Sequence, residues 1–423
     1  MLSGCGFKFI EMNNSDLGSW QLVRLGDICQ TTSGGTPSRK ELKYYSGNIP
    51  WVKSGELDKG LIVDTEEKIS EEAVRNSSAK IFPKGTLLIA LYGATIGKLA
   101  FLGIEAATNQ AVCGIFENEN IASKYLFHFL FFSKPGLVKQ GIGGAQPNIS
   151  QGILKDLKIP LPPVPEQHAI VSKIEELLSE LDKGKQQLET AQQQLKIYRQ
   201  AVLKLAFEGK LTNENVKEGE LPKGWKWVKN KDILKYVTSG SRDWKQFYST
   251  KGSRFVRTQD INSNQLDIDN AAFVSLPEKV EGKRSLIEEG DILMTITGAN
   301  VGKIAVVDFP IKDAYVSQSV ALLKYNDKRI TKYLWYYFQA QGFGKSFIDK
   351  LVYGVGRPVL SLENMREVDV LLCPLEDQQQ IIDELERKLT VCDKIAETIV
   401  NSLQQAETLR QSILKKAFEG KLI

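Results

Sequence analysis

The chain has 423 residues, of which 42% are hydrophobic and 25% charged, so intrinsic disorder and fibrous structure are excluded. The excess of 55 Lys and Arg over 51 Asp and Glu is small and gives only weak support for a polyanionic partner. Five widely separated Cys and two His exclude a disulfide framework, a zinc finger and most His-based catalytic or metal sites.

Residues 1–19 are predicted to be an N-terminal extension ahead of a globular domain that begins at Trp20. Met12 opens a polar lead-in, so residues 1–11 are interpreted as an upstream start extension. N-terminal sequencing that found Met1 retained would contradict this interpretation. The extension lacks the pattern of a signal peptide, and no apolar run in the chain reaches membrane-spanning length, so we predict a cytoplasmic protein.

Residues 20–160 are predicted to form an α+β globular domain. Short β-like runs, such as 86–91, are punctuated by Gly, Asn and Asp. Residues 222–372 have the same character, with β-like runs at 292–296 and 304–307. The small basic excess of the chain lies in these two segments.

Residues 161–212 and 373–423 are predicted to be helical spacers, and 213–221 is predicted to be a linker. Apolar residues recur with a mean spacing of about 3.5 positions from Ile170 to Leu205, which is the pattern of a coiled-coil seam. Proline residues precede each helix and a glycine follows it, as is usual at helix ends. A helix of about 40 residues spans roughly 60 Å.

The second half of the chain repeats the first. The hexapeptide Ala-Phe-Glu-Gly-Lys-Leu at 206–211 recurs at 417–422, an offset of 211 residues. The same offset aligns 146–150 with 357–361, whereas offsets of 204 to 208 align the earlier parts, which indicates loop insertions. We therefore predict an α+β fold with two pseudo-two-fold-related globular domains separated by two long antiparallel coiled-coil helices.

Two glycine-lysine segments, Gly93–Lys98 and Gly298–Lys303, resemble a phosphate-binding P-loop only superficially. Three residues separate their glycines where a P-loop has four, and Leu99 or Ile304 follows the Lys in place of Ser or Thr. A tight turn between two strands is the favoured interpretation, and contact with a DNA phosphate is the alternative. The chain also lacks amino-methyltransferase, GxSxG and HExxH motifs, so we predict no catalytic residue, no metal and no cofactor.

Four polar, glycine-containing stretches, at 32–40, 141–148, 239–245 and 353–357, are candidate DNA-contacting loops. Their side chains can hydrogen-bond to base edges, although solvated loops without a ligand are the alternative. Trp51 and other aromatic residues can stack on bases but are interpreted as core or rim packing. The predicted DNA-binding residues are Thr36, Ser38, Arg39, Lys53, Lys98, Gln146, Asn148, Ser241, Arg242, Arg257, Asn300, Lys303 and Arg357.

The duplicated order of domain, helix, domain and helix resembles the specificity (S) subunit of type I restriction–modification systems. The resemblance extends from Trp20 over the rest of the chain and is carried by the segments 20–28, 51–55, 93–98, 146–150, 162–167, 206–211, 255–259, 298–303 and 417–422. Arg-Pro-Val-Leu at 357–360 departs from Gln-Pro-Asn-Ile at 146–149, so identical DNA contacts are not expected in the two halves.

The resemblance implies two target recognition domains, each reading one half of a bipartite double-stranded DNA sequence, in a non-catalytic subunit. It also implies that the helices set the spacing and bind two copies of a DNA methylation (M) subunit, with restriction (R) subunits as further partners. The predicted partner-binding residues are Ile170, Leu181, Leu195, Phe207, Ile381, Ile395, Leu409 and Phe418. A heptad inserted after Gly184 is expected to lengthen the unread gap of the target.

Two other functions stay open at this point. An enzyme acting on nucleic acid would methylate bases as the purified chain alone. A coiled-coil adaptor without its own DNA specificity would have no DNA affinity, and its binding to partners would not fall steeply with salt as phosphate contacts do.

Overall fold

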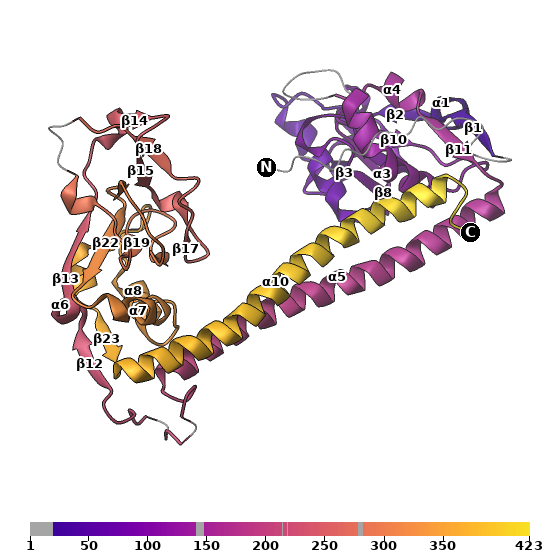
Figure 1. Cartoon of the computed structure of the whole chain (residues 1–423). Coiled ribbons are helices and arrows are strands. Elements are labelled where there is room, and N and C mark those ends of the chain that lie inside the picture. Colours follow the sequence, from indigo (N-terminus) through magenta and orange to yellow (C-terminus); the bar gives the residue numbers. More distant parts are fainter. Residues whose placement is uncertain (1–19, 141–147, 214, 218, 278–281) are drawn as a thin grey trace. The chain divides into compact units, whose positions relative to one another are not determined.

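The computed structural model describes residues 20–140, 148–213, 215–217, 219–277 and 282–423 (Figure 1). The predicted extension at 1–19, with the start extension at 1–11, lies outside the described residues. The chain divides into two compact units. The first comprises the residues up to Leu188 together with Asn401–Ile423, and the second comprises Glu189–Val400.

The first unit contains two β-sheets and a two-stranded ribbon. The first sheet has the strand order β2-β10-β7-β8-β4, the second sheet has the order β5-β3-β9-β6, and β1 pairs with β11. The strands are β1 (Gln21–Arg24), β2 (Thr31–Ser33), β3 (Ile49–Val52), β4 (Leu61–Ile62), β5 (Glu67–Ile69), β6 (Ile81–Phe82), β7 (Leu87–Ala90), β8 (Leu99–Leu102), β9 (Ala106–Thr108), β10 (Val112–Ile115) and β11 (Lys158–Leu161). The α-helices of this domain are α1 (Leu25–Ile28), α2 (Glu71–Arg75), α3 (Ser123–Gln140) and α4 (Gln151–Lys155).

The second unit contains two four-stranded sheets, with the orders β13-β22-β19-β20 and β14-β18-β15-β21, and the pairs β12-β23 and β16-β17. The strands are β12 (Lys226–Lys229), β13 (Leu234–Ser239), β14 (Tyr248–Ser249), β15 (Ser253–Val256), β16 (Ile261–Asn262), β17 (Gln265–Leu266), β18 (Ala272–Val274), β19 (Ile292–Thr295), β20 (Ile304–Val306), β21 (Ala314–Val316), β22 (Val320–Tyr325) and β23 (Asp369–Leu372). The α-helices are α6 (Asn230–Ile233), α7 (Thr331–Tyr337), α8 (Gly344–Leu351) and α9 (Leu362–Glu367). Within this unit, the sheet with β14 and β15 lies at the end remote from β12 and β23 (Figure 1).

The two units repeat one topology, as the sequence repeat predicts. The strands β2-β10-β7-β8 correspond to β13-β22-β19-β20, and the parallel pairs β3·β9 and β15·β21 correspond to each other. The β-like runs predicted at 86–91, 292–296 and 304–307 are strands β7, β19 and β20. The predicted α+β class is therefore confirmed.

The two long helices are α5 (Val164–Phe207) and α10 (Leu375–Phe418), and each has 44 residues. Each begins directly after a proline, Pro163 or Pro374, which is favourable because proline lacks the backbone N–H that the first turn would leave unpaired. Gly209 and Gly420 follow the C-terminal ends in the left-handed conformation, with φ of 76° and 68°.

The halves of α5 and α10 that belong to the first unit pair in an antiparallel arrangement. Asp182 forms an ion pair with Arg410, and Lys185 lies 3.7 Å from Glu407. Residues with higher numbers on α5 therefore contact residues with lower numbers on α10. This arrangement confirms the predicted antiparallel pairing.

The second unit contains the same helix contact. Arg199 of α5 forms an ion pair with Asp393 of α10. At the offset of 211 residues, Arg199 corresponds to Arg410 and Asp393 corresponds to Asp182, so the two ion pairs are one contact formed twice. Exposed ion pairs of this kind add little stability. They show instead that α5 and α10 pair in the same register in both units.

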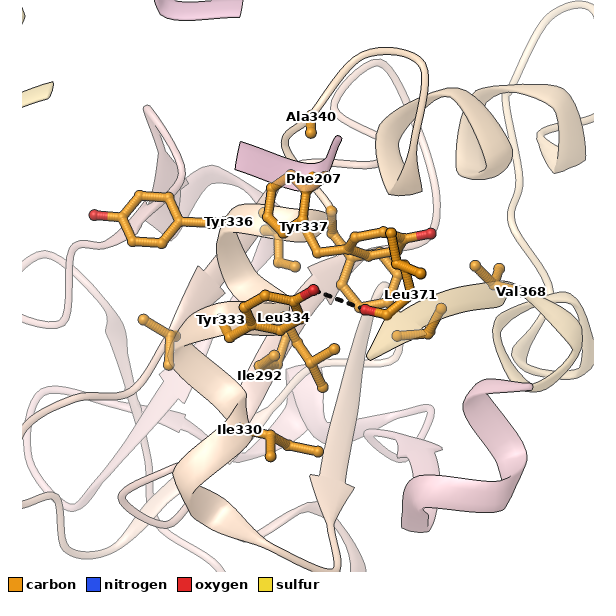
Figure 2. Packing of buried hydrophobic residues seen from close by; sticks show 14 of the residues in the cluster. Phe207, Ile292, Ile330, Tyr333, Leu334, Tyr336, Tyr337, Ala340, Val368 and Leu371 are labelled. Atoms are coloured by element: carbon orange, nitrogen blue, oxygen red, sulfur yellow. Dashed lines mark hydrogen bonds between the residues drawn. The ribbon is translucent and has the colours of Figure 1, made fainter. Parts of the chain in front are cut away.

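Each long helix begins in the core of one unit and ends in the core of the other. At the start of α5, Ile170 and Ile174 are buried in the first unit, and at its end Phe207 is buried in the second. Phe207 packs edge-on against Tyr333 and Tyr337, with ring centroids 5.3 Å away in both cases (Figure 2). The hydroxyl of Tyr333 donates a hydrogen bond of 2.9 Å to a backbone carbonyl of β23.

Helix α10 follows the reverse course. Ile381 and Leu385, near its start, lie in the core of the second unit. Phe418 ends the helix in the core of the first unit, with its ring centroid 5.3 Å from Tyr125 and 5.1 Å from Phe129 of α3. Both units are thus completed by aromatic anchors at helix ends.

A tryptophan of the adjacent domain forms a hydrogen bond with a carboxylate in the first turn of each long helix. The Nε1–H of Trp20 donates to Glu166 at 3.1 Å, and that of Trp225 donates to Asp377 at 2.9 Å. We expect Trp225→Phe to lower the free energy of unfolding of the second unit by about 1–3 kcal/mol, because a hydrogen bond to a charged group is lost. Urea denaturation followed by circular dichroism measures this change.

The matched control is Trp227→Phe. The Trp227 side chain is 45% exposed, and its indole nitrogen makes no hydrogen bond with the residues that the structure describes. A loss below about 0.5 kcal/mol is expected for this variant. Equal losses in the two variants would contradict the anchoring role of Trp225.

Candidate DNA-recognition sites

The repeated sequence motifs converge on one tight turn in each unit. In the first unit the turn Asn109–Val112 joins β9 to β10, and in the second the turn Ser317–Val320 joins β21 to β22. Each is closed by a backbone hydrogen bond of 3.1 Å from its fourth residue to its first. The second residue of each turn is an exposed glutamine, Gln110 or Gln318.

The motifs at 51–56 and 255–260 hold the first residue of each turn. The N–H of Asn109 donates to Val52 at 2.9 Å, and that of Ser317 donates to Val256 at 2.8 Å. The motif itself is fixed by a buried carboxylate at its end. Glu56 accepts from the backbone N–H of Lys53 at 2.9 Å, and Asp260 accepts from that of Arg257 at 2.8 Å. The recurrence of this motif therefore has a structural cause.

A glycine loop packs against each turn. Gly240 donates to the carbonyl of Ser317 at 3.2 Å, and Gly34 donates to that of Val112 at 3.1 Å. A Cβ at Gly240 would lie 1.8 Å from the carbonyl oxygen of Val316, and one at Gly34 would lie 2.1 Å from that of Thr108. Only glycine fits at these two positions, which fixes the start of the candidate loops 32–40 and 239–245.

The third residue of each turn is tied to a strand end. The carbonyl of Ala111 accepts from the N–H of Leu91 at 2.8 Å, and the carbonyl of Leu91 accepts from Ile149 at 2.8 Å. Ser319, Ile296 and Leu360 form the same chain of bonds in the second unit, at 2.9 Å each. These bonds bring the segments 148–150 and 357–361 beside the turn, and isolated bridges pair Tyr92 with Asn148 and Thr297 with Val359.

The two glycine-lysine segments are hairpin turns. The segment 93–98 joins the antiparallel strands β7 and β8, and 298–303 joins β19 and β20. Gly97 donates to Ala90 at 2.8 Å and Gly302 donates to Thr295 at 2.9 Å, with positive φ at both glycines. The predicted tight turn is confirmed. Contact with a DNA phosphate stays a prediction.

In the first unit, two of the predicted DNA-binding cations share one carboxylate. Arg39 forms two hydrogen bonds with Glu67, and Lys53 donates to the same carboxylate at 3.1 Å. The Arg39 guanidinium also lies 4.2 Å from the ring centroid of Tyr45. The hydrogen bonding raises the pKa of Arg39 above its ordinary value and lowers the pKa of Glu67. A bond to Glu66, followed by the one to Glu67, raises the pKa of Lys53.

The other predicted residues of the first unit are placed as follows. Lys98 forms an ion pair with Asp58, and the Thr36 hydroxyl donates to the side-chain oxygen of Gln110. Ser38 and Asn148 are exposed. Gln146 lies outside the described residues.

The second unit has the same kind of turn and neighbouring segments, but its predicted DNA-binding cations are paired differently. The guanidinium of Arg257 is bound by Asp260 through hydrogen bonds of 3.1 and 3.0 Å, which raise the pKa of Arg257. Arg242, Lys303 and Arg357 form no ion pair with any residue in the described ranges. Ser241, Arg242 and Arg357 are exposed, and Asn300 and Lys303 are half-buried. Among the predicted DNA-binding cations with described side chains, those without an ion pair therefore lie in the second unit.

The residues predicted to bind partners divide by exposure. Ile170, Phe207, Ile381 and Phe418 are fully buried inside the units, and Leu181 and Leu195 are half-buried. Ile395 and Leu409 are 45% and 51% exposed. Trp51 is buried, as its interpretation as core packing requires.

Gln110 and Gln318 were not among the residues that sequence reasoning selected. The signal that identifies them is their alignment between the two copies, at an offset of 208 residues. A single polar residue in a turn does not by itself predict a functional site. The structure is needed to show that four of the repeated motifs lie around it.

Groups of potential metal ligands are absent from the part of the chain that the structure describes. In the same residues, no helix combines the length and apolar character needed to cross a membrane.

Comparison with known proteins identifies the family. The family model of the type I restriction modification DNA specificity domain matches residues 18–191 and 222–405. The EcoBI specificity subunit of Escherichia coli is 28% identical, with 99% of this chain and 83% of that protein covered. The MjaIX specificity subunit of Methanocaldococcus jannaschii is 26% identical, with coverage of 97% and 96%.

Solved structures agree with the fold. A chain from a study of complex assembly and conformational transition in a type I R-M system has a TM-score of 0.73 at 21% identity, with 95% of this chain and 98% of that chain covered. The HsdS subunit of Thermoanaerobacter tengcongensis has a TM-score of 0.55 at 21% identity, with coverage of 95% and 97%. The chain belongs to the type I restriction–modification DNA specificity family and is a non-catalytic DNA-specificity subunit with two target recognition domains.

Proposed function

We propose that each unit reads one half of a bipartite double-stranded DNA sequence, through the domains at 20–160 and 222–372. One observation carries this proposal. The tight turn and the segments bonded to it occur in both units, but the polar side chains around the turn differ. The closing bond of each turn and its bonds to the strand ends recur in both units, whereas Arg39 and Lys53 are paired and Arg242 and Arg357 are unpaired. A shared frame with different polar groups suits two different half-sites, since base readout depends on a few side chains.

The long helices, within 161–212 and 373–423, are proposed to set the gap between the half-sites and to bind two copies of a DNA methylation subunit. Exposed apolar side chains on these helices support binding of a protein partner, because water-exposed apolar groups gain from burial. In the second unit these residues are Ile197, Tyr198, Leu205, Leu375, Val391, Ile395 and Val400, and in the first unit Leu409. Restriction subunits are proposed as further partners, and the segment 213–221 as a linker.

The proposal is tested by sequencing the methylome of cells that express the chain with its cognate methylation subunit. The expected result is a methylated motif of two short specific halves with a fixed gap. Replacing residues 222–372 by the same domain of a relative should then change one half only. Co-purification of the subunits without any new methylated motif would instead favour the adaptor function.

A second prediction concerns the length of the helices. We expect the gap to lengthen by about three base pairs when one heptad, about 10 Å of helix, is inserted after Gly184 and another at the facing turn of α10 near Glu407. The paired insertion is needed because Lys185 lies opposite Glu407. Methylome sequencing measures the gap.

The control is the same heptad inserted in the linker 213–221, which lies outside both helices. This variant is expected to keep the original gap. If the helix insertion also left the gap unchanged in a methylating complex, the length of the helices would not determine the gap between the half-sites.

A further inference from the structure

We propose that Gln110 and Gln318 are matched base-reading residues, each of which recognises an adenine in its own half-site. The inference rests on the proposed reading of one half-site by each unit, and it assigns one reading residue and one base to each half. Adenine is chosen because its major-groove edge offers one acceptor and one donor, which a glutamine amide can bind together.

The first argument is the rigidity of the turn that carries each glutamine. In the second unit, Ser317 is bonded to β15 and to the Gly240 loop, Ser319 is bonded to the end of β19, and Val320 closes the turn. In the first unit Asn109 is bonded to β3, Ala111 is bonded to the end of β7, and Val112 closes the turn and accepts from Gly34. A side chain on such a support loses little backbone freedom on binding, which is how preorganised groups gain affinity and selectivity.

The second argument is that each glutamine is the exposed residue of a turn whose other residues are buried or half-buried. The neighbours Thr108, Val316 and Val320 are fully buried, whereas Gln110 and Gln318 are exposed. The side chain of Gln318 makes no hydrogen bond with any residue in the described ranges. Neither glutamine is needed to close its turn, because backbone groups form the closing bonds.

The third argument is the surroundings of each glutamine. The turn of Gln318 lies between the loop that carries Arg242 and the strand end beside the segment that carries Arg357. These two exposed cations can hold phosphates on either side while the amide reaches a base edge. In the first unit, Thr36 donates to the amide oxygen of Gln110 and so orients it, while the second lone pair of that oxygen and the amide N–H groups stay available for a base edge.

The test uses the full chain with its cognate methylation subunit and the methylome as the readout. Gln318→Ala is expected to relax one adenine position in one half-site, with discrimination at that position falling roughly 5- to 150-fold. Gln110→Ala is expected to relax one adenine position in the other half. Co-purification with the methylation subunit verifies that each variant is folded.

A second substitution separates base reading from a structural role. In Gln318→Glu the carboxylate can only accept hydrogen bonds, so the relaxed position should shift from adenine toward cytosine, whose exocyclic amine is a donor. The control is Gln265→Ala, which removes an exposed glutamine of the same unit on β17 and should leave the motif unchanged. A structural role would lower methylation at every site without changing the base preference.

The outcomes are distinguishable. A wild-type complex that methylates no split motif defeats the proposed function and this inference together. A split motif that keeps its bases in the Ala and Glu variants overturns only the role of the glutamines. Relaxation at a position other than adenine, or a uniform fall in methylation, also overturns it.

Discussion

The Gly240→Ala variant is expected to lose detectable methylation at every target site. The added Cβ would lie 1.8 Å from the carbonyl oxygen of Val316 and 2.6 Å from the carbonyl carbon of Ser317. Both atoms belong to the backbone, so no side-chain rotation relieves the clash. The loop that carries Ser241 and Arg242 must move away from the turn, and overpacking of this kind costs about 1–3 kcal/mol.

The functional loss should exceed the loss of stability. A bipartite target needs both halves, so displacement of one loop removes the whole site. Methylome sequencing and urea denaturation of the same variant measure the two effects separately. Gly34→Ala should act in the same way in the first unit, where the Cβ would meet the carbonyl oxygen of Thr108 at 2.1 Å.

The matched control is Gly152→Ala. Its Cβ would meet only the Ser150 hydroxyl oxygen, at 3.5 Å, which is ordinary contact. The complex of this variant with the methylation subunit should methylate the wild-type motif at the wild-type level. A folded Gly240→Ala protein that did the same would show that the loop position is not needed for recognition.

The Phe418→Ala variant is expected to destabilise the first unit by about 3–5 kcal/mol, the usual cost of removing a fully buried aromatic ring. Phe418 has no exposed surface, and it packs against Tyr125, Phe129 and Phe132 of α3. Three aromatic contacts therefore lose their common partner. Urea denaturation measures the free energy, and hydrogen exchange of α3 and the end of α10 locates the loss.

The control for this prediction is Leu409→Ala on the same helix. Leu409 is 51% exposed, so its truncation is expected to cost about 1 kcal/mol or less. Faster exchange should appear at the end of α10 in the Phe418 variant and not in the Leu409 variant. Similar losses in both variants would contradict the role of Phe418 as the anchor of the helix end.

The long helices and the duplicated fold could be predicted because their signals are local or repeated. The apolar spacing from Ile170 to Leu205 follows directly from helical geometry. The repeat places two copies of every motif in one order, and a pseudo-two-fold arrangement of two helices makes them antiparallel. The glycine-lysine turns were predictable because short segments with two glycines favour tight turns.

The composition of the sites could not be predicted in the same way. Leu91 is bonded to Ala111 and to Ile149, which are far from it in sequence, and no local pattern encodes that meeting. Sequence reasoning selected Arg39 and Lys53 for their charge, but their carboxylate partner Glu67 is set by the neighbouring strands of a sheet. Long-range strand pairing decides which charges are neutralised and which glutamines are presented.

The cores of the two units differ in how late in the chain their last residues occur. The core of the second unit uses residues from Val202 to Leu389, so all of it has been synthesised before translation ends. The core of the first unit joins Trp20 to Phe418, almost the full length of the chain. Since a core closes only when its parts exist, the domain made first is the one finished last, after the final turns of α10 leave the ribosome.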